Sequence, residues 1–194
     1  MTEARDTIRE TLTPATQITI REQVRATLDR SPLVRPTTPN GMAMRVRVSA
    51  AGRFGWVGDG AYRYDEADSR GKPWPPIPEL WKAIADRVAG PHAWDCAIVN
   101  WYDEDASLGW HRDQSERDTS LPIVTISLGD SCSWAIRADE GGPVSRCRLE
   151  TGDVTLLAGE TRGYFHTIER LIAAPLFSPL SKRGRLSVTI RVAG

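Results

Sequence analysis

The second half of the sequence is a succession of short apolar segments, each of strand length, separated by turn residues. The segments cover residues 96–102, 122–128, 132–137, 146–149, 154–157, 164–168 and 185–192. Gly129-Asp130, Gly141-Gly142-Pro143 and Thr151-Gly152-Asp153 stand between several of them, and glycine, proline and aspartate are common turn residues. Short strands at this spacing are typical of a β-sandwich or jelly roll. We therefore expect a mainly β fold with a β-sandwich or jelly-roll core over about residues 94–194.

Two amphipathic helices are expected before these strands, over residues 19–30 and 79–89. Apolar residues recur at helical spacing in both, namely Ile20, Val24 and Leu28 in the first and Leu80, Ile84 and Val88 in the second. Ser31-Pro32 ends the first helix and Gly90-Pro91 ends the second, because these pairs do not continue a helix. Residues 1–16 are polar and are expected to be flexible, which leaves residues 17–194 as a single domain.

The region between the helices, about residues 38–78, is rich in loop residues and aromatic rings. A half-buried strand is expected over residues 42–48, where apolar residues alternate with Arg45 and Arg47. Five aromatic residues follow, namely Phe54, Trp56, Tyr62, Tyr64 and Trp74. Long loops are usually functional or disordered, and this aromatic density argues against disorder. Two interpretations remain: the rings cap the core, or they line a functional loop.

The composition is that of an ordinary globular protein. The 194 residues are 40% hydrophobic and 26% charged, with a formal net charge of zero. We expect no membrane span and no secretory signal, because no apolar run is long enough. The three cysteines are odd in number and far apart, so we expect reduced thiols in a cytoplasmic protein. We expect a monomer, and any nucleic-acid binding would require a local basic face.

A metal site is predicted from the only two histidines that lie in strand-like segments. His111 and Asp113 are two residues apart, so on a strand their side chains point to the same side. His166 is the third candidate ligand. Two histidines and one carboxylate form the facial triad of non-haem Fe(II) oxygenases, which leaves coordination positions open. The absence of a thiolate argues against structural zinc. A His-x-Asp tripeptide alone is weak evidence, since such residues are also common on surfaces.

The final segment has two chemically different faces. Arg185, Ser187, Thr189 and Arg191 share one face, whereas Leu186, Val188, Ile190 and Val192 share the other. The polar face is either solvated on the outside of a sheet or directed into a polar cavity. In the second case the two guanidinium groups would need anionic partners, and their geometry suits carboxylates. A dicarboxylate beside an iron site indicates 2-oxoglutarate.

An ordered set of motifs resembles the AlkB family of Fe(II)/2-oxoglutarate-dependent dioxygenases. The motifs are Phe54-Gly55-Trp56, Lys72-Pro73-Trp74-Pro75, Asn100-x-Tyr102, His111-x-Asp113, Pro122-Ile123-Val124-x-Ile126-Ser127-Leu128-Gly129, Gly152-Asp153-Val154, Gly159-Glu160-x-Arg162-x-x-x-His166 and Arg185 to Arg191. Each piece alone is unspecific, but together they cover about residues 20–194 in family order. The resemblance implies a double-stranded β-helix (a jelly-roll, cupin-like core) with a nucleotide-recognition lid at about residues 38–78.

The resemblance also implies roles for individual residues. His111, Asp113 and His166 would hold Fe(II), with 2-oxoglutarate and O₂ as cosubstrates. Arg185 would pair with the distal carboxylate of 2-oxoglutarate, and Arg191 would lie nearer its chelating end. Asn100 and Tyr102 would donate hydrogen bonds to the cosubstrate. The position between the two arginines is often asparagine in the family, and Ser187 stands there; its hydroxyl can still donate to a carboxylate.

The resemblance also implies which residues contact the substrate. Trp56 matches the aromatic residue that stacks on the flipped base, while Tyr62 and Tyr64 fall in the lid, where a tyrosine touches the phosphate backbone. The family often carries an acidic residue two positions after the iron-binding aspartate. Here that position is Ser115, followed by Glu116. We expect either that Ser115 changes the base preference or the efficiency, or that Glu116 takes over the contact.

The implied activity is oxidative demethylation of 1-methyladenine and 3-methylcytosine in DNA, with release of formaldehyde, for repair of alkylation damage. Single strands would be preferred, because the damaged base must leave the stack. The alternatives are the same chemistry on RNA or tRNA bases, and a catalytically silent nucleic-acid-binding module. The silent module would have a broken metal triad or missing arginines, and the sequence has neither. Cations near the lid are candidates for backbone binding, namely Arg45, Arg47, Arg53, Arg63, Arg70 and Lys72.

Overall fold

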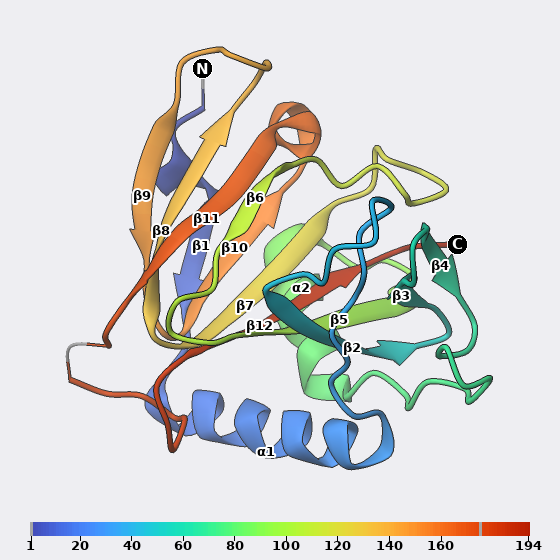
Figure 1. The fold of residues 1–194 in the computed structure, drawn as a ribbon. Coiled ribbons are helices and arrows are strands. Elements are labelled where there is room, and N and C mark those ends of the chain that lie inside the picture. The colour runs from blue at the N-terminus through green and yellow to red at the C-terminus, as the bar shows by residue number, and fades with distance from the viewer. Residues whose placement is uncertain (1, 175) are drawn as a thin grey trace.

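The computed structural model describes residues 2–174 and 176–194, and within these residues two antiparallel sheets face each other (Figure 1). The larger sheet has the strand order β1-β10-β7-β12-β5-β2, and the smaller has the order β6-β11-β8-β9. The larger sheet consists of β1 (Ile8–Thr11), β2 (Val46–Gly52), β5 (Cys96–Tyr102), β7 (Ile123–Gly129), β10 (Asp153–Leu157) and β12 (Arg185–Arg191). The smaller consists of β6 (Leu108–His111), β8 (Ser131–Arg137), β9 (Ser145–Leu149) and β11 (Phe165–Ile172).

Two helices cover the outer face of the larger sheet (Figure 1). Helix α1 (Pro14–Arg30) begins where the hydroxyl of Thr13 accepts a hydrogen bond from the Thr16 amide at 3.2 Å. Helix α2 (Glu79–Ala89) ends at Gly90, which adopts a positive φ of 82°. Their apolar residues form one core with the outward side chains of the larger sheet. Neither helix is long and apolar enough to cross a membrane.

Strand β12 occupies the middle of the larger sheet, between β7 and β5. Its residues Leu186, Val188 and Ile190 join the core beneath the helices. The alternate residues, from Arg185 to Arg191, point between the two sheets and border a cavity there. All seven residues of the strand are buried. Of the two interpretations of this segment, the structure therefore supports the polar cavity and excludes the solvated outer face.

The prediction of a mainly β jelly roll is confirmed by this arrangement of antiparallel sheets. Several boundaries differ from the predicted ones. Helix α1 begins at Pro14 rather than at residue 19, and β2 covers Val46–Gly52 rather than residues 42–48. The strand continues past Val48 because Ser49, Ala50 and Ala51 pair with β5. These small residues carry no strand signal in the sequence.

The N-terminus differs from the flexible segment expected at residues 1–16. Ala4–Thr7 form a 3₁₀ helix, η1, and Ile8–Thr11 form β1, which pairs with β10 at the edge of the larger sheet. The amide of Ala4 donates to the hydroxyl of Ser145 at 2.9 Å, and the Ala4 side chain is fully buried. Four residues of strand are too few for a periodic pattern, so the sequence alone could not indicate this pairing.

The region between α1 and α2 contributes a separate hairpin beside the larger sheet (Figure 1). Strands β3 (Gly55–Gly58) and β4 (Tyr62–Asp65) pair in it, with Trp56 opposite Tyr64. A short 3₁₀ helix, η2 (Gly159–Gly163), precedes β11. Gly55 lies against the Trp74 ring so closely that a Cβ there would approach the indole to 2.3 Å. This close contact fixes the hairpin to the following loop, which contains Trp74.

The ordered N-terminus makes a prediction about stability. Ala4→Asp places a charge in the core and should lower the free energy of unfolding by at least about 2 kcal/mol. Arg5→Asp introduces the same residue at the next, exposed position and should change it by less than about 0.5 kcal/mol. Chemical denaturation measures both. Equal and small effects would mean that residues 4–11 are not docked in solution.

Candidate metal centre and cavity

A cavity of about 470 Å³ lies between the two sheets and opens beneath the β3–β4 hairpin. Its walls come from β2, β5, β7, β10 and β12 of the larger sheet and from all four strands of the smaller, β6, β8, β9 and β11. Apart from the cations near the lid, all the residues predicted to bind metal, cosubstrate or substrate border this cavity: Trp56, Tyr62, Tyr64, Asn100, Tyr102, His111, Asp113, Glu116, His166, Arg185, Ser187 and Arg191. Segments far apart in the sequence thus converge on one space.

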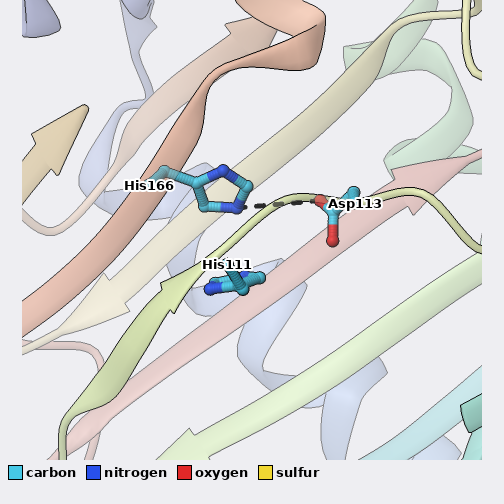
Figure 2. Close-up of side chains that lie close together, drawn as sticks. All are labelled: His111, Asp113 and His166. Atoms are coloured by element: carbon cyan, nitrogen blue, oxygen red, sulfur yellow. Dashed lines mark ion pairs between the residues drawn. The ribbon is translucent and has the colours of Figure 1, made fainter. Parts of the chain in front are cut away.

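The three predicted metal ligands lie together at one end of this cavity (Figure 2). Strand β6 pairs with β11 so that His111 stands directly opposite His166. Their ring centroids are 4.2 Å apart. Asp113 follows β6, and its Oδ2 lies 3.8 Å from Nε2 of His166. One ligand atom from each of the three residues lies within 4.8 Å of the other two, which is close enough for a single metal ion.

Hydrogen bonds to the backbone orient both imidazole rings. Nδ1 of His111 lies 2.8 Å from the carbonyl oxygen of Gly109, and Nδ1 of His166 lies 3.2 Å from that of Tyr164. A carbonyl oxygen only accepts, so the proton of each ring is on Nδ1 and the lone pair is on Nε2. Burial and the neighbouring imidazole lower the pKa of His166 to about 4. A neutral ring with a free Nε2 is what a metal ion requires.

Asp113 is held as an anion. Burial acts to raise the pKa of its carboxyl, but the charge of Arg191 and the two imidazoles outweigh burial and hold it well below the usual value. The nearest guanidinium nitrogen of Arg191 lies 3.3 Å from Oδ2 of Asp113. The backbone carbonyl of Asp113 accepts from Arg162 at 2.8 Å. Both the charge and the chain position of this ligand are therefore fixed from outside the triad.

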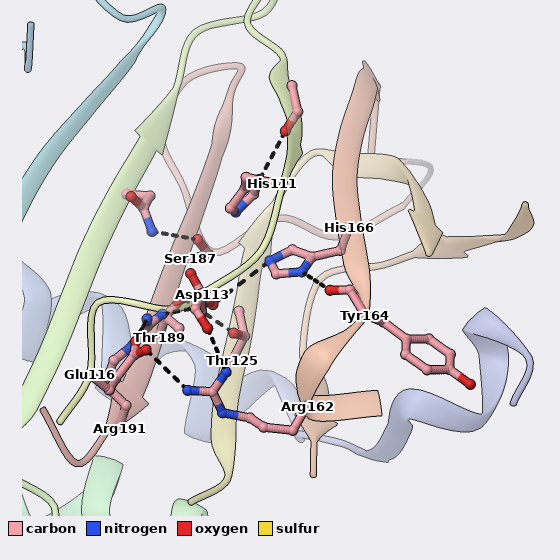
Figure 3. Close-up of polar contacts among 12 residues, drawn as sticks. His111, Asp113, Glu116, Thr125, Arg162, Tyr164, His166, Ser187, Thr189 and Arg191 are labelled. Atoms are coloured by element: carbon pink, nitrogen blue, oxygen red, sulfur yellow. Dashed lines mark hydrogen bonds and ion pairs between the residues drawn. The ribbon is translucent and has the colours of Figure 1, made fainter. Parts of the chain in front are cut away.

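Glu116 is the centre of a buried ion network next to the triad (Figure 3). Its Oε1 accepts from the Tyr64 hydroxyl at 2.8 Å and from the Arg191 guanidinium, and its Oε2 accepts from Arg162 at 3.1 Å. Burial acts to raise the pKa of Glu116, but Arg191 and the Tyr64 hydroxyl lower it further than burial raises it. Glu116 is thus an anion with both oxygens occupied.

This network changes the interpretation of two residues. Glu116 borders the cavity as expected, but its carboxylate is used internally and is not free to accept from a base. Arg162 is a residue of the site that the sequence pattern does not identify, although it lies in the motif that ends at His166. It is buried and donates to the carbonyl of Leu121 at 2.7 Å as well as to Asp113 and Glu116. The partners of Arg162 are distant in sequence, so no local signal could have identified them.

Arg185 differs from Arg191 in the partners of its guanidinium group. Its side chain is only 1% exposed, yet among the described residues no carboxylate lies within ion-pair distance of it. It donates to the Ser127 hydroxyl at 2.7 Å and weakly to the Asp130 carbonyl at 3.5 Å, and its Nε has no partner. A buried guanidinium without an anion is costly. Its position in the cavity wall therefore indicates an anionic ligand.

Smaller polar groups lie between the two arginines. Ser187 projects from β12 into the cavity and receives a long hydrogen bond, 3.4 Å, from the Asn100 side chain on β5. Tyr102 is two residues further along β5 and pairs with Arg185 in the strand register. Burial raises the pKa of the Tyr102 phenol, so it is a neutral group that can donate. The cavity wall thus offers donors at several points between Arg185 and Arg191.

The β3–β4 hairpin supplies the aromatic wall. The rings of Trp56 and Tyr62 are tilted against each other with centroids 5.1 Å apart. Tyr62 is 44% exposed, whereas Tyr64 turns inward and donates to Glu116. Ser115 is exposed at the rim of the cavity. Trp56 and Tyr62 thus border the cavity from the hairpin, and His111 borders it from β6.

Comparison with known proteins agrees with this geometry. The family model of the 2OG-Fe(II) oxygenase superfamily matches residues 6–191. The chain is 34% identical over 179 residues to the alpha-ketoglutarate-dependent dioxygenase AlkB homolog of Caulobacter vibrioides, covering 89% of this chain and 80% of that protein. It is 33% identical over 173 residues to the alpha-ketoglutarate-dependent dioxygenase AlkB of Escherichia coli, covering 85% and 79%.

A solved structure, that of OsALKBH1, superposes with a TM-score of 0.83 at 24% sequence identity and covers 95% of each chain. At this identity the likeness concerns the fold. It agrees with the double-stranded β-helix expected from the sequence and with the two facing sheets described above.

The ion network leads to a prediction about how its central carboxylate contributes to stability. Glu116→Gln keeps the shape of the side chain but leaves Arg162 and Arg191 short of one negative charge. We expect the free energy of unfolding to fall by about 2 kcal/mol, because hydrogen bonds to charged groups are strong. Ser115→Ala, at the exposed neighbour, should change it by less than about 0.5 kcal/mol. Similar unfolding curves for the two variants would refute a stabilising network.

Proposed function

Because the chain belongs to the AlkB family of the 2-oxoglutarate–Fe(II) oxygenase superfamily, we propose that it oxidatively removes methyl groups from nucleic-acid bases. The protein is an Fe(II)- and 2-oxoglutarate-dependent dioxygenase that uses O₂. The proposal concerns the assignment of its residues and its substrate, namely N-methylated bases such as 1-methyladenine and 3-methylcytosine.

We assign the iron to Nε2 of His111, Nε2 of His166 and a carboxylate oxygen of Asp113. This donor set fits the metal, because two neutral imidazoles and one carboxylate are the ligands of non-haem Fe(II) oxygenases. The second shell also fits: both Nδ1 groups donate to the backbone, and Asp113 is fixed by Arg191 and Arg162. Bound iron and 2-oxoglutarate supply an oxidant derived from O₂, with succinate and CO₂ as products.

One observation carries the cosubstrate assignment: the buried Arg185 pairs with no carboxylate of residues 2–174 and 176–194, and it borders the same cavity as the His-Asp-His cluster. A dicarboxylate that reaches from Arg185 towards the metal ligands would neutralise that charge. Ser187, Asn100 and Tyr102 would donate to it along the way. Arg191 lies at the metal end, where its charge is shared between Asp113 and Glu116.

The substrate base would enter beside the β3–β4 hairpin. Trp56 and Tyr62 offer aromatic faces for stacking, and a base methylated at a pairing position leaves its stack at low cost. Hydroxylation of the methyl group would give a hydroxymethyl group on nitrogen. This group breaks down to formaldehyde and the unmodified base. Tyr64 is held by Glu116 and Arg191, so its role would be to fix the hairpin over the cavity.

The finer parts of the proposal are single-stranded DNA as substrate, a monomer as the active form and a cytoplasmic location. The three cysteines are free, which agrees with a reducing compartment. Ser115 at the cavity rim offers a hydroxyl where an acidic residue is frequent in the family, and this supports a shifted base preference. RNA and tRNA bases are the alternative substrates. The complete triad and the two buried arginines argue against a catalytically silent module.

The test is formaldehyde release from oligonucleotides of one sequence that contain 1-methyladenine or 3-methylcytosine, as DNA and as RNA, with Fe(II) and 2-oxoglutarate. We expect release that requires 2-oxoglutarate, and the ratio of the DNA and RNA rates identifies the preferred substrate. His111→Ala and Asp113→Ala should lower the rate by at least about 100-fold, because each removes a metal ligand.

The matched control is His92→Ala, which removes the one histidine outside the triad. His92 is half-buried against Trp94 and does not border the cavity, so the rate should stay within about twofold. Formaldehyde release that survives in the Asp113 variant would contradict the metal assignment. Succinate formation without formaldehyde on any oligonucleotide would contradict the proposed substrate class.

A further inference from the structure

The cations around the hairpin, which the sequence favoured for backbone binding, are largely engaged with other groups of the protein. Four of these cations pair with carboxylates: Arg47 with Asp103 at 2.7 Å, Arg53 with Glu66 at 2.9 Å, Arg63 with Asp59 at 2.7 Å and Arg70 with Asp68 at 2.5 Å. The other two donate to backbone carbonyls, Lys72 to that of Arg30 at 2.9 Å and Arg45 weakly to that of Asp105 at 3.5 Å. A cation that already has a carboxylate partner attracts a phosphate less strongly. The hairpin is therefore a weak candidate for holding the nucleic-acid backbone.

A different group of cations lies at the other rim of the cavity. The guanidinium of Arg137 stacks over the Trp110 ring, 4.4 Å from its centroid, and lies 5.3 Å from that of Phe165. The guanidinium of Arg112 stacks over Phe165 at 4.1 Å. Two planar cations and two aromatic rings thus alternate, and we call these four residues the arginine–aromatic stack.

The two arginines of the stack have no competing anions. Within residues 2–174 and 176–194, no carboxylate lies in ion-pair distance of Arg112 or Arg137. The Nε of Arg137 is buried without a hydrogen-bond partner, so the donors that this residue can offer to a ligand are its terminal N–H groups. Stacking on the rings holds the guanidinium planes in place while the terminal N–H groups stay available. This combination differs from the hairpin cations, whose donors are mostly used.

The arginine–aromatic stack is next to the metal triad. Trp110 and Arg112 flank His111 and border the cavity, and Phe165 precedes His166 on β11. Phe165 and Arg137 are opposite each other in the β11–β8 register. Because neighbouring residues of a strand point to opposite faces, the stack lies on the outer side of the smaller sheet. It extends from the end of the edge strand β6 across β11 to β8.

We propose that the arginine–aromatic stack binds the nucleotides that flank the target base in a single-stranded nucleic acid. Guanidinium groups pair with phosphates, and bases stack on aromatic rings and on arginine planes whatever their sequence. A strand whose damaged base lies in the cavity would pass directly over Trp110 and Arg112, which form both the cavity rim and part of the stack. This inference rests on the proposed function, because it assumes a nucleic-acid substrate.

The experiment measures binding of an unmethylated fluorescein-labelled single-stranded oligonucleotide by fluorescence anisotropy at several salt concentrations. Arg137→Gln should raise the Kd at least about fivefold and reduce the slope of log K against log salt by about 0.7 for the lost phosphate contact. Arg112→Gln, at an exposed position, is a second variant with the same expected effect. Arg137→Lys keeps the charge but not the planar stack, and should give a smaller loss than Arg137→Gln.

The matched control is Arg63→Gln, which removes a hairpin arginine paired with Asp59. It should bind the oligonucleotide like the wild type. A loss of binding in Arg63→Gln together with unchanged binding in Arg112→Gln and Arg137→Gln would overturn the inference in favour of the hairpin. If the wild-type protein demethylates oligonucleotides but Arg112→Gln, Arg137→Gln and Arg137→Lys all bind them as the wild type does, the inference is overturned and the proposed function is not. Wild-type protein that neither binds nor demethylates any oligonucleotide would overturn the proposed function as well.

Discussion

The two faces of β12 are the constraint on which the rest of the structure depends. One face carries Leu186, Val188 and Ile190 into the core beneath the helices, and the other carries Arg185 and Arg191 into the space between the sheets. The strand lies between β7 and β5 and pairs with both along its length. The helices cover one of its faces and the smaller sheet lies opposite the other, so all seven residues are buried. Burial of two guanidinium groups is unfavourable unless anions compensate them. The two arginines differ in whether carboxylates of the protein balance their charge.

Arg191 is compensated from within, by Asp113 and Glu116, and this pairing links separate parts of the chain. Through Glu116 it connects the β3–β4 hairpin at Tyr64 with η2 at Arg162, and through Asp113 it fixes a metal ligand. Arg185 has no such partner among the described residues, and in the proposed function a ligand anion pairs with it. In that proposal a single strand supplies both the support for the metal site and the anchor for the anion, and the antiparallel pairing of β6 with β11 adds the two histidines.

Much of this could be predicted from the sequence because it is encoded by local alternation. The period of two in residues 185–191 and the His-x-Asp spacing placed the candidate ligands on the correct faces. What could not be predicted depends on contacts between distant segments. Arg162 meets Glu116 across 46 residues, β1 is too short to show a pattern, and the partners of Arg63 and Arg137 depend on how loops and strands meet in space. A sequence shows that an arginine is present but not whether an anion already holds it.

The central claim is that the cavity accepts a 2-oxo acid by pairing its distal carboxylate with Arg185 while its other end meets a metal held by His111, Asp113 and His166. Calorimetric titration of the Mn(II)-loaded protein with 2-oxoglutarate and with 2-oxobutyrate, which lacks the distal carboxylate, tests it most directly. The account predicts that 2-oxoglutarate binds at least about tenfold more tightly, as a charge-assisted pair in a buried site should, and that removal of the metal weakens its binding. Equal affinities for the two acids would contradict the assignment of Arg185, and binding that is indifferent to the metal would contradict the assignment of the triad.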